Sequence, residues 1–176
     1  GETSGVINSQ GMRTNRISNH EYYCKIGEEL SKFLSQNTEA GFVYRVDLRL
    51  RPEGQRGAIA LTLRGYEMYY ESWGRAWERA MLLRARPVAG DKGLGMDFME
   101  MIRPFVFRKY LDFSAIDEIS KLKTRIDATF KKTDIKRGYG GIREIEFFSQ
   151  ALQLIYAGRE PLLRERNVLK ILHRLF

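Results

Sequence analysis

The 176-residue chain has one cysteine, two histidines and no long hydrophobic run. Cys24 has no second cysteine, which excludes an intrachain disulfide and a cysteine zinc site. Two histidines, His20 and His173, also argue against a histidine-rich metal site. The longest uninterrupted apolar runs, such as residues 80–83, are four residues long, which excludes a membrane-spanning helix and a signal-peptide core. A reducing, cytoplasmic setting is therefore expected.

The chain has fewer acidic than basic side chains. Thirty Lys and Arg stand against 22 Asp and Glu, which gives a net charge of +8. Such a surplus favours a polyanionic partner such as nucleic acid, a nucleotide, phosphate or an acidic protein, although a solvated basic surface is the simpler alternative. Ten Phe, nine Tyr and two Trp provide enough aromatic mass for a hydrophobic core.

The first half of the chain mixes helix and strand patterns. Apolar residues at helical spacing predict a helix from Ser18 or Asn19 to about Gln36. Strict alternation predicts the clearest strand over residues 42–51. We further expect a short strand or an approach to a helix over 58–63, helices over 65–72 and 73–83, and an edge strand or extended segment over 84–89.

From Met96 onward the periodicity is almost wholly helical. Helices are predicted near residues 97–107, 114–132, 141–157 and 164–176. The chain is therefore divided near residue 95 into a mixed part, residues 1–95, and a helical bundle, residues 96–176. This order of elements predicts an α+β fold.

The predicted strand places one carboxylate among three arginines. Asp47 shares a strand face with Arg45, Arg49 and Arg51. Such a face could hold a metal ion through the carboxylate and phosphate oxygens through the guanidinium groups. The alternative is an Asp that its neighbours neutralise on a sheet surface. Arg84 and Arg86 would share a face of the later extended segment and could join an anion site.

A glycine pair precedes the helix predicted over 141–157. Gly140 and Gly141 would let the backbone approach a ligand closely, and a helix N-terminus presents free N–H groups to an anion. Glu144 and Glu146 are two residues apart and point about 200° apart on a helix, so at most one can face such a site. An ordinary helix start, in which the glycines pack and the glutamates complement the helix dipole, is the alternative.

Several of these stretches, in this order, resemble one family, the bacterial glutamine synthetase adenylyltransferase/adenylyl-removing enzymes. The resemblance rests on the motifs Val43-Tyr44-Arg45-Val46-Asp47-Leu48-Arg49-Leu50-Arg51-Pro52, Trp77-Glu78-Arg79-Ala80, Arg84-Ala85-Arg86 and Gly140-Gly141-Ile142-Arg143-Glu144-Ile145-Glu146-Phe147. The resemblance is greater to the N-terminal, AMP-removing half, through Arg103-Pro104-Phe105-Val106-Phe107-Arg108, Gly158-Arg159-Glu160-Pro161 and the Glu at position 144.

The resemblance implies a DNA polymerase beta-like nucleotidyltransferase domain followed by a helical domain. Its chemistry uses two Mg²⁺ ions held by three carboxylates, and Asp47 matches the third. The other two form an Asp-x-Asp pair that this sequence lacks. We therefore expect a truncated catalytic domain that is inactive when isolated, with Asp47 as catalytic residue and metal ligand. The expected phosphate- or nucleotide-binding residues are Arg45, Arg49, Arg51, Arg84, Arg86, Gly140, Gly141 and Glu146.

The implied function is removal of AMP from a tyrosine of glutamine synthetase by phosphorolysis, which yields ADP. The alternative within the family is attachment of AMP from ATP, and a basic nucleic-acid-binding module is a third, less favoured reading. The implied partners are adenylylated glutamine synthetase, the PII signal protein, and ATP, ADP or phosphate. Neither nucleic acid nor a membrane is expected among them.

Overall fold

The computed structural model describes residues 5–110 except 8, 9 and 15, residues 135–175 except 137 and 139, and residues 117, 120, 121 and 124. The chain forms two compact units, Gly1–Tyr66 and Glu67–Phe176, which divide inside helix α2 (Leu63–Ser72). This division lies earlier than the change of character predicted near residue 95. The predicted helix 114–132 lies outside the described residues.

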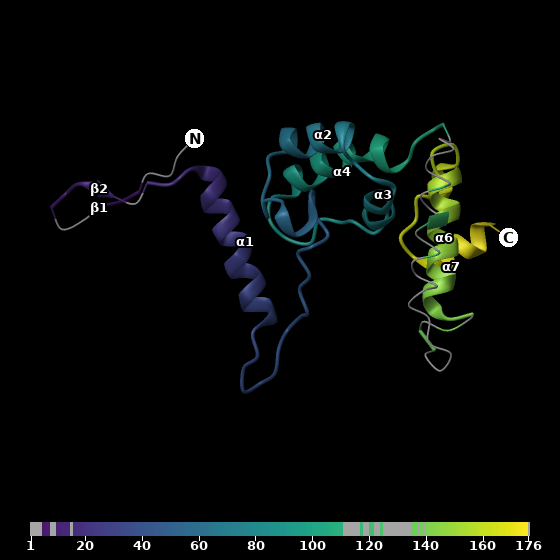
Figure 1. Cartoon of the computed structure of the whole chain (residues 1–176), viewed down its shortest axis with the longest axis horizontal. Helices are drawn as coiled ribbons and strands as arrows, with labels where there is room; N and C mark the ends of the chain where they lie inside the picture. The colour runs from purple at the N-terminus through teal and green to yellow at the C-terminus, as the bar shows by residue number, and fades with distance from the viewer. Residues whose placement is uncertain are drawn as a thin grey trace. The chain divides into compact units, whose positions relative to one another are not determined.

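The first unit contains a small hairpin and one long helix (Figure 1). Strands β1 (Val6–Ile7) and β2 (Arg13–Thr14) pair antiparallel. Helix α1 (Asn19–Ser35) begins where predicted, because the Ser18 hydroxyl accepts a hydrogen bond from the amide of Glu21 at 3.1 Å. This contact satisfies one of the free amides of the first turn. The helix prediction is confirmed, with its end one residue before Gln36.

The strand predicted over residues 42–51 is wrong for this structure. The segment forms no ladder with another described strand, and its end turns into a 3-10 helix, η1 (Gly54–Arg56). The Tyr44 amide donates instead to the carbonyl of Leu34 at 2.8 Å. An alternating sequence becomes a strand only beside a partner strand, because the ladder supplies its hydrogen bonds. With β1 and β2 as the only strands among the described residues, the α+β class and the nucleotidyltransferase domain stay predictions.

Residues 58–61 also form no strand, and their other reading, an approach to a helix, agrees with the start of α2 at Leu63. Residues 85–88 are irregular, which excludes a paired edge strand there and leaves the extended reading. Neither segment has a described strand beside it, so neither can complete a ladder.

The second unit is helical. Its elements are the part of α2 from Glu67 on, α3 (Ala76–Leu82), α4 (Lys92–Val106), α6 (Ile142–Tyr156), the 3-10 helix η2 (Pro161–Leu163) and α7 (Val168–Leu175). Helix α4 begins before the predicted start because the Asp91 carboxylate caps the Leu94 amide at 2.7 Å. Helix α3 packs against α4 and α6, and α7 packs against α6 and η2.

The hydrophobic core lies in this second unit. Ile102, Val106, Ala157 and Ile171 are at most 1% exposed. The Tyr70 and Phe105 rings stack with centroids 4.8 Å apart. Aromatic stacking of this kind adds to the free energy that burial contributes.

The first unit has little buried surface of its own. Helix α1 has no buried residue, and its apolar residues Tyr22, Tyr23, Ile26, Leu30 and Phe33 are all at least 44% exposed. The packing energy that stabilises the described part of the chain therefore comes mainly from α2, α3, α4, α6 and α7. Within the described residues, no helix has the length and apolarity needed to cross a bilayer.

Candidate functional site

Asp47 and Arg49 form a two-point ion pair in the first unit. Arg49 donates from Nε to Asp47 Oδ1 at 2.9 Å and from Nη2 to Asp47 Oδ2 at 2.6 Å. The Arg49 backbone amide donates to Oδ1 as well, at 3.0 Å. These bonds, joined by the charge of Arg45, hold the pKa of the Asp47 carboxyl well below its ordinary range. Asp47 is therefore ionised at neutral pH, with both oxygens engaged by one guanidinium.

Arg51 makes contacts with the backbone that the sequence did not predict. Its guanidinium donates to three backbone carbonyls, those of Leu48, Gln55 and Gly57. These bonds fix the turn after Pro52, where Glu53 and Gly54 both have left-handed backbone angles, φ 59° and 60°. The structure thus gives Arg51 a structural task, and binding of phosphate by this residue stays a prediction.

The described residues do not fit a Mg²⁺ ion. No cluster of three or more His, Cys, Asp or Glu side chains suited to a metal occurs in the described ranges. Asp47 offers one carboxylate, and Arg49 already occupies both of its oxygens. Mg²⁺ sites in proteins usually combine one or two carboxylates with water and phosphate oxygens, so Asp47 does not by itself form such a site while Arg49 engages both of its oxygens.

The glycine pair before α6 is closed by contacts within the chain. The Gly140 amide donates to Glu144 Oε2 at 2.8 Å, and the Gly141 amide donates to the carbonyl of Gly138 at 2.9 Å. Gly141 is buried, and a Cβ there would lie 2.7 Å from the carbonyl oxygens of Ile135 and Gly138. These contacts favour the packing role of the glycine pair over anion binding, because the amides that an anion would use have partners.

The remaining predicted binding residues belong to the second unit. Arg86 and Glu146 are exposed. Arg84 is partly buried, and its Nη2 is a buried atom with no hydrogen-bond partner in the described structure. The structure therefore brings together Asp47 and Arg49, with Arg45 acting on Asp47 through its charge. It places the other predicted binding residues in a separate unit: Arg84, Arg86, Gly140, Gly141 and Glu146.

Sequence reasoning assigned no role to Glu78 and Arg79, which the structure buries completely or nearly so, at 0% and 4% exposed. Arg79 donates to the carbonyls of Val106 and Leu154, with Nη2–O distances of 3.1 and 3.4 Å. Those carbonyls lie at the C-terminal ends of α4 and α6, where the helix dipole is negative. The one available signal was the charged pair inside the helical stretch Trp77-Glu78-Arg79-Ala80.

Glu78 performs the matching task at the start of α3. Its Oε2 accepts from the Arg75 amide at 2.9 Å, whereas its Oε1 is buried without a described partner. Burial raises the pKa of this carboxyl, against the opposing effect of its hydrogen bonds from Arg75 and Tyr69.

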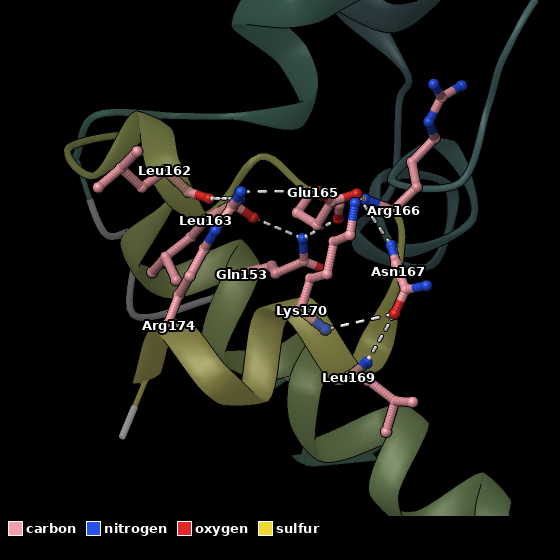
Figure 2. A network of polar contacts seen from close by, with 9 residues as sticks. All are labelled: Gln153, Leu162, Leu163, Glu165, Arg166, Asn167, Leu169, Lys170 and Arg174. Carbon is pink, nitrogen blue, oxygen red and sulfur yellow. Dashed lines mark hydrogen bonds and ion pairs between the residues drawn. The ribbon is translucent and has the colours of Figure 1, made fainter.

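A polar network joins α6 to the segment before α7 (Figure 2). Gln153 Nε2 donates to the carbonyls of Leu163 and Glu165, both at 2.6 Å. The Glu165 carboxylate accepts from the amides of Arg166 and Asn167, at 2.7 and 3.1 Å, and these bonds lower its pKa. These bonds order the turn before α7, and Gln153 Oε1 is left buried without a partner in the described structure.

Comparison with known proteins gives consistent matches. Residues 6–101 match the profile of the glutamate-ammonia ligase adenylyltransferase family, and residues 114–175 match a profile described as GlnD PII-uridylyltransferase. Proteins named bifunctional glutamine synthetase adenylyltransferase/adenylyl-removing enzyme are similar along nearly the whole chain. One from Xanthomonas campestris pv. campestris is 49% identical over 95% of the chain, and one from Pseudomonas putida is 45% identical over 99%. In each case the chain spans 18% of the relative's length.

Proposed function

The chain belongs to the glutamate-ammonia ligase adenylyltransferase family, and from this premise we propose that it is part of an enzyme that removes AMP from adenylylated glutamine synthetase. The family profile spans more than half of the chain. The names of the relatives include both an adenylyltransferase and an adenylyl-removing activity. Glu144 supports the second activity through the resemblance, because Glu at this position is a feature that resembles the AMP-removing half.

The proposed reaction is phosphorolysis. An oxygen of inorganic phosphate attacks the phosphorus of the AMP–tyrosine ester, the bond from phosphorus to the tyrosyl oxygen breaks, and ADP forms. The leaving tyrosyl oxygen takes up a proton from solvent. Phosphate is already anionic near neutral pH, so its attack needs no dedicated general base, which agrees with a site region without histidine.

The observation on which the proposal most depends is the Arg45–Asp47–Arg49 cluster. A guanidinium fork that fits two carboxylate oxygens also fits two phosphate oxygens. Arg45 and Arg49 would neutralise charge on the attacking phosphate and on the phosphorus centre. Mg²⁺ binding at Asp47 belongs to this proposal only together with further carboxylates, because the described residues offer one.

The proposed partners follow from the activities for which the related proteins are named. Adenylylated glutamine synthetase would be the protein substrate, with phosphate consumed and ADP released. The similarity of residues 114–175 to a PII-uridylyltransferase profile supports the PII signal protein as a regulatory partner of the helical part.

The proposal is tested on a polypeptide of the relatives' length that includes this chain. Incubation with AMP-modified glutamine synthetase and phosphate should yield ADP, and the Asp47→Asn variant should not. Incorporation of AMP from ATP that is lost in Asp47→Asn, without phosphate-dependent ADP formation, would instead assign the site to the adenylylating reaction. Absence of both activities in the unmodified polypeptide would refute the proposal.

A further inference from the structure

The structure divides three neighbouring arginines into three different roles. The Arg51 guanidinium donates its hydrogen bonds to carbonyls of its own turn, so movement of this side chain would break that turn. Arg45 is exposed and acts on Asp47 through its charge. Arg49 alone in this cluster covers the Asp47 carboxylate, and it does so from a side chain that is 63% exposed.

We propose that Arg49 is an anion-released latch on Asp47: a phosphate dianion that engages the Arg49 guanidinium frees the Asp47 carboxylate. This inference rests on the proposed function, since phosphate is the attacking reactant there. It adds an order of events to that function, because the carboxylate becomes available only after phosphate has arrived.

The geometry makes the latch easy to open. The bonds to Asp47 use Nε and Nη2 of Arg49, so the Nη1 edge of the guanidinium faces neither carboxylate oxygen and offers a first contact to an anion. Ion pairs between exposed side chains are weak because water screens both charges. A phosphate dianion carries twice the charge of the carboxylate and accepts from the same guanidinium donors, so it competes with Asp47 for Arg49.

The geometry also says which atom is released. The Arg49 backbone amide holds Asp47 Oδ1 at 3.0 Å, and this bond does not depend on the position of the guanidinium. When the side chain turns away, Oδ1 stays anchored and Oδ2 loses its partner at 2.6 Å. The freed oxygen then stays in a defined position, because the backbone amide continues to hold the other oxygen of the same carboxylate.

The test measures binding of inorganic phosphate to the 176-residue chain without turnover. By equilibrium dialysis at constant ionic strength, Asp47→Asn should raise phosphate affinity about fivefold or more, the lower end of typical coupling between two binding events. Arg49→Gln should abolish the binding. Glu53→Gln, which removes a charge from the next turn, is the matched control and should change the affinity less than twofold.

A second readout separates a latch from simple charge repulsion. The Arg49 Nε–H signal in ¹⁵N NMR should move on phosphate addition in the unmodified chain, from its carboxylate-bound position toward a new one. In Asp47→Asn it should start elsewhere, and in Arg49→Lys it should be absent. Equal effects of Asp47→Asn and Glu53→Gln, or an Arg49 signal that phosphate leaves unchanged, would overturn the latch. Failure of ADP formation would refute the proposed function and leave these binding results standing.

Discussion

At the scale of single residues, charged side chains in this chain serve two different ends. Asp47 and Arg49 form an exposed pair that can exchange partners, whereas Glu78 and Arg79 are buried and fixed. Exposed pairs contribute little to stability, and buried charges cost a great deal when a partner is lost. Mutations at the two places should therefore have opposite signatures, one in ligand binding and the other in stability.

Replacement of Arg79 by Met should lower the free energy of unfolding by about 3 kcal/mol, because the carbonyls of Val106 and Leu154 would be left buried without that donor. Thermal and urea denaturation followed by circular dichroism measure the effect. Arg86→Met, at an exposed position, is the control and should change stability by less than about 0.5 kcal/mol. Similar losses for both variants would contradict the capping role of Arg79.

Glu78 should give the second unit a specific dependence on pH. Burial raises the pKa of its carboxyl, so the folded state binds the proton more tightly than the unfolded state does. The contribution of Glu78 to stability should then be fully present below the ordinary carboxyl value of about 4.3 and should be lost as pH rises through the raised folded value. Urea midpoints across this range, compared between the unmodified chain and Glu78→Gln, should show that the substitution removes this fall.

At the scale of elements, glycine positions decide how helices start and meet. Gly158 brings the end of α6 against the segment after α4, since a Cβ there would lie 1.9 Å from the carbonyl oxygen of Arg108. Arg164 completes this junction by donating to the carbonyl of Ala157 at 2.8 Å. The joined ends of α4 and α6 are thus stabilised by donors from other elements, because a helix leaves its last carbonyls unpaired.

The glycine pair before α6 gives a matched test of the packing role. Gly141→Ala should lower the melting temperature markedly, because the new Cβ would clash with two carbonyl oxygens, each only 2.7 Å away. In Gly140→Ala the new Cβ would meet no neighbour, and only the left-handed backbone angle of φ 69° opposes the change. This angle should lower the free energy of unfolding by roughly 1 kcal/mol. Differential scanning calorimetry compares the two. A larger loss for Gly140→Ala would contradict the assignment of Gly141 as the packed residue.

At the scale of the whole molecule, the two compact units differ in how they are stabilised. The second unit has a core and buried polar bonds, whereas the apolar side chains of α1 remain exposed. Hydrophobic burial supplies most of the free energy of folding. We therefore expect the amides of α1 to exchange with solvent faster than those of α4 and α6 in the 176-residue chain, as measured by hydrogen exchange and mass spectrometry.

The basic surplus of the chain also makes a prediction at this scale. A net charge of +8 attracts polyanions at low salt. If the basic side chains bind the phosphate groups of the proposed substrates, gel-shift experiments should show only weak RNA binding that disappears at physiological ionic strength. Tight, saturable RNA binding under those conditions would favour the nucleic-acid-binding reading instead.

Turnover by the longer protein should require the Asp47 carboxylate. Asp47→Asn in a polypeptide of the relatives' length should abolish turnover and leave the circular dichroism spectrum unchanged, because Asp47 is exposed and its loss removes no packing. The 176-residue chain should release no measurable AMP or ADP from modified glutamine synthetase. Its described residues place one carboxylate, that of Asp47, beside Arg45 and Arg49 and contain no cluster of three side chains suited to a metal ion. Near-normal turnover in the variant would contradict the role of Asp47.

Local information in the amino-acid order was enough to predict α1 and α6 and the family. The cap at Ser18, the apolar spacing of α1 and α6 and the ordered motifs around Asp47 and Gly141 are properties of short stretches, and they predicted elements and relationship correctly. What residues 42–51 became depended on distant partners, since an alternating stretch without a neighbouring strand has no ladder to join. The same holds for Arg51, Glu78 and Arg79: their types were visible, but the carbonyls and amides they meet were set by packing, because a charged side chain is buried only where the folded chain supplies its hydrogen bonds.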